Sequence, residues 1–197
     1  MLILANYGFE FPTTRASLKR AIGSARGTML IISLGGTRAD AEAEMKGALQ
    51  IGFKEENVYI FDADKADELM SKDYTYIEIT AGNTFQLLSQ IRCYNLDEFI
   101  NAQIDKRCTL IGLSAGACIC CPNTEYVLLF DDNNHISDGD YTGLGLMNQY
   151  VLCHYDIRGT TEKYEIRRFI GYESDLITIT GDDVVVIDNK GGIENVK

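Results

Sequence analysis

The chain contains only two histidines and two prolines, no tryptophan, and few positive charges. Its 197 residues include 18 Lys and Arg against 29 Asp and Glu, which gives a formal net charge of −11. A surface of this sign repels nucleic-acid phosphates and anionic lipid headgroups, so neither is an expected partner. No apolar run reaches the roughly 20 residues of a transmembrane helix. Any histidine chemistry has just two candidate residues.

The first ten residues lack the features of a secretory signal, because no basic segment precedes a long apolar one. A cytoplasmic location with six reduced cysteines is therefore expected. A chain of this length is most simply one domain, covering residues 1–197. Such a domain buries roughly 70% of its unfolded surface, which is enough for a core without disulfides or metal.

Short apolar runs alternate with segments of helical spacing over the first 113 residues. This alternation is typical of a mostly parallel sheet with helices on both faces, and right-handed crossovers then give a doubly wound α/β fold. Strands are expected at 1–5, 29–34, 57–61, 74–80 and 109–113, and helices at 13–25, 38–51, 63–70, 84–92 and 96–104.

The alternation weakens after Ser114. Strands are expected at 126–130 and 149–153 around a polar loop at 131–142, followed by a helix at 161–170 and a terminal pair of strands at 176–180 and 184–188. No internal repeat, low-complexity segment or linker is present, so nothing indicates a second domain.

Three glycine-containing turns follow predicted strands, at residues 35–37, 81–84 and 112–116. Ligands of open α/β sheets bind beyond the carboxyl ends of the strands, so these turns are the first candidates for a site. Gly35-Gly36-Thr37 is a possible phosphate cradle. Because it lacks a complete dinucleotide-binding or P-loop motif, a tight turn with a threonine cap is the favoured interpretation.

Gly112-Leu113-Ser114-Ala115-Gly116 fits the nucleophile-elbow motif G-x-S-x-G. The elbow would expose the Ser114 hydroxyl and make the Ala115 amide one oxyanion donor. Gly82 suits the second donor, since no Cβ obstructs its backbone. Asn83 and Thr84 are expected to contact substrate, and one of them to cap the next helix, two roles that are compatible. The alternative interpretation of the elbow is a glycine-rich turn with a capping serine.

A serine nucleophile needs a base, and the two histidines are the candidates. His135 lies in a polar loop, whereas His154 follows the apolar run 150–153 and would lie at the same edge of the sheet as the elbow. His154 is therefore the favoured base. The residue spacing leaves four carboxylates open as the partner of the imidazole: Asp182, Asp183, Asp156 and Glu173.

Cys118-Ile119-Cys120-Cys121 contains a C-x-x-C spacing, and Cys153 precedes His154. A metal or redox site is one interpretation of these cysteines. Buried cysteines acting as small apolar side chains are favoured, because the cluster lies in an apolar segment. No metal and no cofactor is expected.

These segments resemble the serine peptidases that include dipeptidase E and cyanophycinase, within the class I glutamine amidotransferase-like superfamily. Residues 81–88 are similar to the family's GGNTFQLL, residues 111–117 to its G-x-S-A-G-A elbow, and residues 143–146 with His154-Tyr155 to its G-L-G-L and His-aromatic segment. The resemblance implies a flavodoxin-like three-layer sandwich and a serine-type hydrolase that cleaves short peptides through an acyl-enzyme.

The same resemblance assigns Ser114 as nucleophile, His154 as base, and the amides of Gly82 and Ala115 as the oxyanion hole. The family's third, acidic residue lies in a turn after the penultimate strand, which favours Asp182, with Asp183 as the alternative.

Family members specific for N-terminal Asp carry an Arg in the helix after the histidine segment. Glu162 occupies that place in this chain, so an aspartyl preference is not expected unless Arg158 or Lys163 substitutes. Two other functions remain open, an acyl hydrolase or acyltransferase on the same scaffold and an inactive ligand-binding homologue. A monomer or a homodimer acting on short peptides is expected.

Overall fold

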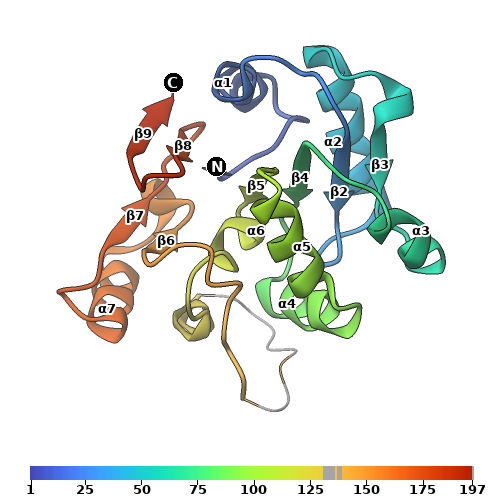
Figure 1. Ribbon diagram of the computed structural model, residues 1–197. Coiled ribbons are helices and arrows are strands. Elements are labelled where there is room, and N and C mark those ends of the chain that lie inside the picture. The colour runs from blue at the N-terminus through green and yellow to red at the C-terminus, as the bar shows by residue number, and fades with distance from the viewer. Residues whose placement is uncertain (131–135, 137–138, 197) are drawn as a thin grey trace.

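The computed structural model describes residues 1–130, 136 and 139–196. Its main sheet has the strand order β3-β2-β4-β5-β1-β8-β9 (Figure 1). Five neighbouring strands are parallel: β1 (Leu2–Ala5), β2 (Met29–Ile32), β3 (Val58–Ile60), β4 (Tyr76–Ile79) and β5 (Thr109–Leu113). The edge pair β8 (Val184–Ile187) and β9 (Ile193–Val196) is antiparallel. The predicted mostly parallel α/β sheet is confirmed.

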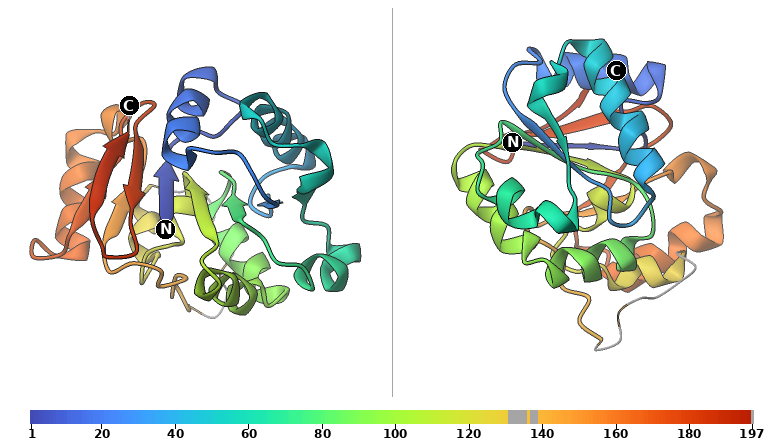
Figure 2. Two further views of the ribbon diagram at one scale, coloured as in Figure 1. Left: turned by 45° about the horizontal axis from the view of Figure 1, so that its top comes forward. Right: turned by 90° about the vertical axis from the view of Figure 1, so that its right-hand side faces the viewer.

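Helices cover both faces of this sheet (Figure 2). The chain moves toward one edge from β1 to β3 and returns for β4 and β5, so right-handed crossovers place the helices before this reversal on one face and those after it on the other. One face holds α1 (Pro12–Ile22) and α2 (Arg38–Ile51); the other holds α4 (Thr84–Cys93), α5 (Leu96–Asp105) and α6 (Ala115–Cys118). No helix in the described ranges is both long and apolar enough to cross a lipid bilayer.

Shorter elements complete the chain. The helix predicted at 63–70 is a 3-10 turn, η2 (Ala63–Lys65), followed by α3 (Ala66–Met70), and the one predicted at 161–170 is α7 (Thr160–Ile170). Three further 3-10 turns are η1 (Glu55–Asn57), η3 (Glu125–Leu129) and η4 (Tyr155–Ile157). The helix α1 ends before its predicted bound because Gly23 adopts a positive φ of 72°.

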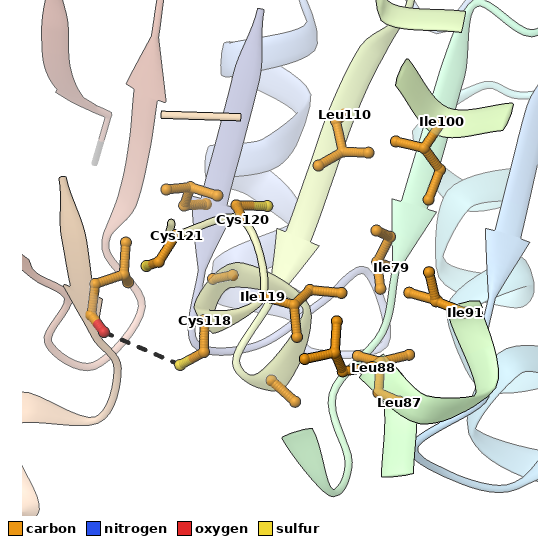
Figure 3. Close-up of a cluster of buried hydrophobic side chains, with 14 of the residues drawn as sticks. Ile79, Leu87, Leu88, Ile91, Ile100, Leu110, Cys118, Ile119, Cys120 and Cys121 are labelled. Atoms are coloured by element: carbon orange, nitrogen blue, oxygen red, sulfur yellow. Dashed lines mark hydrogen bonds between the residues drawn. The ribbon is translucent and has the colours of Figure 1, made fainter. Parts of the chain in front are cut away.

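The core has two halves, one on each face of the sheet. Side chains alternate along a strand, so Leu2 and Leu4 pack under α4–α6 while Ile3 and Ala5 pack under α1 and α2. Figure 3 shows Leu88 of α4 beside Ile119 within the first half. Each fully buried aliphatic side chain stabilises the fold by about 1.5–3 kcal/mol relative to an exposed one.

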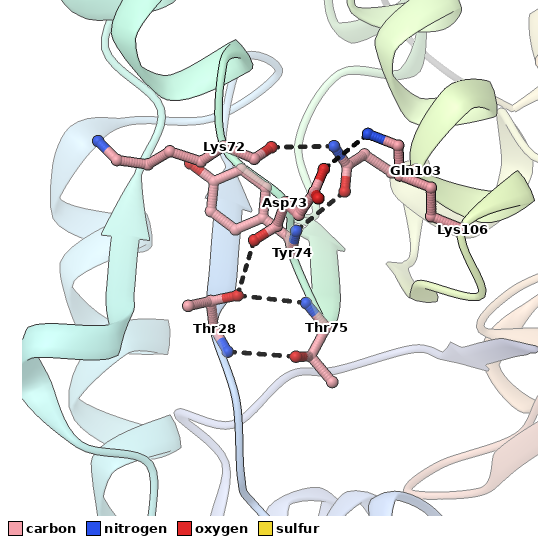
Figure 4. Close-up of polar contacts among 7 residues, drawn as sticks. All are labelled: Thr28, Lys72, Asp73, Tyr74, Thr75, Gln103 and Lys106. Atoms are coloured by element: carbon pink, nitrogen blue, oxygen red, sulfur yellow. Dashed lines mark hydrogen bonds and ion pairs between the residues drawn. The ribbon is translucent and has the colours of Figure 1, made fainter.

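The amino ends of the strands are joined by polar contacts (Figure 4). The side chain of Gln103 in α5 donates to the Lys72 carbonyl over 3.0 Å and accepts the Tyr74 amide over 2.9 Å. Next to β2 and β4, the Thr28 amide donates to the Thr75 hydroxyl and the Thr75 amide donates to the Thr28 hydroxyl, each over 3.3 Å. These contacts fix the end of the sheet opposite the glycine-containing turns.

Residues 126–130 were expected to form a strand, and this prediction is wrong. They lie in the 3-10 turn η3, where the Thr124 carbonyl accepts the Val127 amide and the Val127 carbonyl accepts the Phe130 amide. Tyr126 and Val127 are buried, but Leu128 and Leu129 are exposed. A short continuous apolar run does not distinguish a strand from a short helix.

The predicted pairing of the two terminal strands is also wrong. β7 (Leu176–Thr178) pairs in parallel with β6 (Tyr150–Leu152) in a separate two-stranded sheet, whereas β8 pairs with β1 and β9. The strand β9 was not predicted, because its four largely exposed residues, Ile-Glu-Asn-Val, show neither a continuous apolar run nor regular alternation. Strand pairing depends on tertiary packing, which adjacency in the sequence does not report.

All six cysteines are free thiols, and five of them are buried, which confirms their interpretation as apolar side chains. Burial raises the pKa of Cys108 and of Cys121 to about 12.

We expect an aromatic disulfide reagent to label one thiol, exposed Cys93, in the native protein and all six in denaturant. Cys93→Ser should remove the native signal. Rapid labelling of a second thiol in the folded protein would contradict this.

Candidate active site

The candidate site lies where the carboxyl ends of several strands meet. Ser114 follows β5 and His154 follows β6, and the Ser114 Oγ lies 3.0 Å from the His154 Nε2. The two residues are 40 positions apart in the sequence. The structure therefore brings the predicted nucleophile and base into hydrogen-bond contact.

Ser114 has the backbone geometry of a nucleophile elbow, with φ 50° and ψ −104°. A positive φ is uncommon for serine and indicates strain held by the surrounding structure. A Cβ on Gly112 would lie 2.7 Å from the Gly116 carbonyl oxygen, and one on Gly116 would lie 2.1 Å from the Ile79 carbonyl oxygen. The motif glycines thus allow α6 to approach β4 and β5. The Ser114 side chain makes no capping hydrogen bond to α6.

Of the two predicted oxyanion donors, Ala115 adjoins the elbow, and Gly82 lies in the turn after β4, the strand that pairs with β5. Ala115 is the first residue of α6, directly after Ser114. Gly82 has φ 138°, and a Cβ there would lie 2.1 Å from the Gly35 carbonyl oxygen, so only glycine fits. The turns after β2 and β4 therefore pack against each other.

Asn83 and Thr37 cap helices. The Asn83 Oδ1 accepts the amides of Phe85 and Gln86 over 3.0 and 2.8 Å at the start of α4. Thr37 forms a capping box with Asp40 at the start of α2, which confirms the cap interpretation of the first glycine turn. The remaining predicted contact residue, Thr84, is buried at the first position of α4.

His154 is held by a residue that the motifs did not indicate. Its backbone is left-handed, with φ 55°, and its amide donates to the Asn6 Oδ1 over 2.8 Å. The buried Asn6 also donates to the carbonyls of Gly181 and Ile179 over 2.9 and 3.3 Å. The edge of the Tyr7 ring meets the His154 ring, with centroids 5.3 Å apart. Asn6 and Tyr7 follow β1, so the strand-end rule could have found them.

The surroundings keep the imidazole neutral near pH 7. Burial, and secondarily the positive charge of Arg158, lower the pKa of His154 below 6.5, while the negative charge of Asp156 opposes them. A neutral imidazole is the form that accepts a proton from serine. Asp156 itself accepts the Gly181 amide over 3.2 Å.

Asp182 and Asp183, the acids that the family resemblance favoured, bind other residues and not the His154 ring. The Asp182 Oδ1 accepts the Thr14 hydroxyl of α1, and the Asp183 Oδ2 accepts the Thr180 hydroxyl, each over 2.8 Å. Among the described residues, the hydrogen bond of the His154 ring goes to Ser114 and none goes to a carboxylate. The alternative base, His135, and most of the predicted loop lie outside the described residues.

Glu162 neutralises a cation beside the site. Its Oε1 lies 2.5 Å from the Arg158 Nη1, and the Arg158 Nε donates to the Cys153 carbonyl over 2.8 Å. The guanidinium also stacks 3.8 Å from the centre of the Phe130 ring. Arg158 is therefore fixed and its charge is compensated.

A doubly wound α/β sheet carrying a serine–histidine pair at a strained elbow defines a class of serine hydrolases. The sequence model of peptidase family S51 matches residues 15–194, and the chain belongs to this family. Among the described residues, no three His, Cys, Asp or Glu side chains gather closely enough to hold a metal ion.

Curated relatives with similar sequences are also named as peptidases. An uncharacterized peptidase of Pasteurella multocida is 34% identical over 94 residues, 47% of this chain and 44% of that protein. One of Listeria monocytogenes is 29% identical over 127 residues, 62% of this chain and 60% of that protein. The aligned segments thus span about half the length of these curated relatives.

Solved structures share the fold. A provisionally assigned peptidase E of Listeria monocytogenes has a TM-score of 0.79 at 22% identity, covering 100% of this chain and 97% of that one. A peptidase from an acI-B1 actinobacterium has a TM-score of 0.67 at 18% identity, covering 93% and 81%. At these identities the likeness concerns the fold alone.

Proposed function

We propose that the protein is a serine peptidase that hydrolyses short peptides through an acyl-enzyme on Ser114. The observation that carries this proposal is the 3.0 Å contact between the Ser114 Oγ and the His154 Nε2 at the strained elbow. Membership of a peptidase family agrees with it.

In the proposed mechanism, His154 Nε2 accepts the Ser114 proton as Oγ attacks the scissile carbonyl carbon. The amides of Gly82 and Ala115 donate to the resulting oxyanion, and each such donor typically contributes about 10²- to 10³-fold in rate. The imidazolium then protonates the leaving amine as the C–N bond breaks. Water, deprotonated by His154, attacks the acyl carbon and releases Ser114.

Asp156 supports the imidazolium in this proposal, because its charge favours the protonated ring. Asp182 is assigned no catalytic part, since its carboxylate accepts the hydroxyl of Thr14 in α1. The base is thus oriented mainly through its backbone, by Asn6.

A panel of dipeptides and blocked tripeptides, assayed on wild type and Ser114→Ala, tests the function. Hydrolysis of free peptides by the wild type alone supports the proposal. Ester hydrolysis without peptide hydrolysis would favour an acyl hydrolase instead. Equal peptide turnover by both proteins, or no reaction of the wild type with a fluorophosphonate, would contradict a serine peptidase.

We propose a preference for an uncharged first residue, because Glu162 already compensates the charge of Arg158. Glu162→Gln is expected to raise kcat/KM for N-terminal Asp relative to N-terminal Ala by about tenfold, since a hydrogen bond to a charged group contributes about 1.5–3 kcal/mol. Glu165→Gln, at an exposed position of the same helix, is the matched control. An unchanged Asp-to-Ala ratio in Glu162→Gln would show that Arg158 does not face the substrate.

A further inference from the structure

Two carboxyl groups lie in the apolar core between the sheet and α2. Glu78, in the central strand β4, is fully buried, and Glu44 of α2 is 4% exposed. Neither oxygen of Glu78 meets hydrogen-bond geometry with a described residue, although Glu44 lies near enough for its charge to raise the pKa of Glu78. Burying carboxyl groups in this way destabilises a fold, so the pair calls for a functional explanation.

Glu44 holds the segment that follows β1. Its Oε2 accepts the Phe9 amide over 2.5 Å and the Glu10 amide over 3.4 Å. A Cβ on Gly8 would lie 2.1 Å from the Glu44 Oε1, and one on Gly47 would lie 2.1 Å from the Phe9 carbonyl oxygen. Residues 6–10 are therefore closely packed on α2 through the Glu44 carboxylate.

The other end of this segment holds the proposed base. Asn6 accepts the His154 amide and Tyr7 meets the His154 ring, as described above. Only Gly8 separates these contacts from the amides that Glu44 holds. A continuous set of contacts thus joins the buried carboxylate to the catalytic imidazole.

We propose that Glu44 is a positioning residue for His154, and that the charged form of its carboxylate fixes residues 6–10 in the geometry that the reaction requires. This inference rests on the proposed function. Loss of the charge weakens the bonds to Phe9 and Glu10, because a carboxylate is a stronger acceptor than a carboxylic acid. Asn6 and Tyr7 then hold His154 less firmly.

The charge changes close to neutral pH. Burial raises the pKa of Glu44 to about 7, and burial raises that of Glu78 well above its usual range. The titratable groups that face Glu44 are Glu78 from β4 and Glu10 from the segment, while the charged Arg15 of α1 donates to the Phe9 carbonyl. Glu78 thus stays protonated while Glu44 loses its charge as the pH falls through about 7.

The pH dependence of kcat/KM tests the proposal. In the wild type two protonations, of Glu44 and of His154, each lower activity, so the acid limb of log kcat/KM should be steeper than the slope of 1 that a single protonation gives. Glu44→Gln keeps a side-chain acceptor that does not titrate, so the acid limb of its log kcat/KM should have a slope of 1. The difference in activity between this variant and the wild type should lie in kcat rather than in KM. Glu42→Gln, at an exposed position of α2, is the matched control and should behave as wild type.

An NMR titration of the His154 ring provides a readout without turnover. Only two histidines are present, so His154→Asn identifies the signal. A second inflection near pH 7 is expected in the wild type and not in Glu44→Gln. Its presence without peptide hydrolysis would overturn the proposed function and leave this inference intact. Identical slopes and NMR curves in folded wild type and Glu44→Gln would overturn the inference.

A second variant covers the case in which Glu44→Gln does not fold. Glu10 is exposed, and its negative charge raises the pKa of Glu44. Glu10→Gln should therefore move the second inflection to lower pH while the protein stays folded. An inflection that does not move would contradict its assignment to Glu44.

Discussion

Replacement of Ser114 by alanine is expected to abolish fluorophosphonate labelling and to lower kcat/KM for peptides by about 10⁴- to 10⁶-fold, as is typical for loss of a catalytic nucleophile. The Ser114 Oγ is the atom that His154 Nε2 contacts over 3.0 Å. The strained backbone at φ 50° holds this hydroxyl at the carboxyl edge of the sheet. Alanine removes the attacking atom and leaves the elbow backbone in place.

Ser33→Ala is the matched control for this prediction. Ser33 also follows a strand of the parallel sheet, and it is partly exposed like Ser114, but its hydroxyl donates to the Thr37 carbonyl over 3.2 Å. Full activity and labelling are expected in Ser33→Ala. Residual turnover above about 1% in Ser114→Ala would point to another nucleophile, because loss of a nucleophile costs far more than a hundredfold.

The parallel part of the fold was predictable because local signals and tertiary structure agree there. The helix at 38–51 has its predicted bounds, since Thr37 and Asp40 form a capping box and Gly52 takes a left-handed conformation. The strand at 109–113 also has its predicted bounds, being a short buried run that ends at the Ser114 elbow. Strands buried on both faces are read directly from such runs.

The rest depends on contacts between distant residues. The strand β9 is recognisable only from its pairing with β8, and the parallel pairing of β6 with β7 has no local signature. At the site, the motifs identified Ser114 and His154, which are brought together. No motif contains Asn6, and the strand-end rule that includes it does not distinguish it from the other residues that follow strands.

The assignment of the acid shows the same limit. Asp182 lies in the turn between β7 and β8, which the sequence predicted to reach the site. Asn6, which holds His154, does donate to the carbonyl of the neighbouring Gly181. The orientation of the turn nevertheless directs the Asp182 carboxylate to Thr14 of α1. Proximity of a turn is thus predictable from strand order, whereas the direction of each side chain is not.

The second large effect is expected at the base. His154→Asn should lower kcat/KM by about 10⁴- to 10⁶-fold, comparable with loss of the nucleophile, since the two residues act as a unit. Asparagine is the suitable replacement because His154 has a left-handed backbone with φ 55°, a conformation that asparagine tolerates. The Asn6 contact to the backbone amide is then retained, and the loss reports the imidazole alone.

His135→Asn is the matched control, since these are the two histidines of the chain. Full activity is expected for this variant, because the Ser114 hydroxyl is bound to His154.

The double variant Ser114→Ala with His154→Asn should be no slower than either single variant, because the steps that need both residues are already lost in each. Additive losses in the double variant would mean that the two residues act independently, and inactivation by His135→Asn alone would transfer the role of base to that residue.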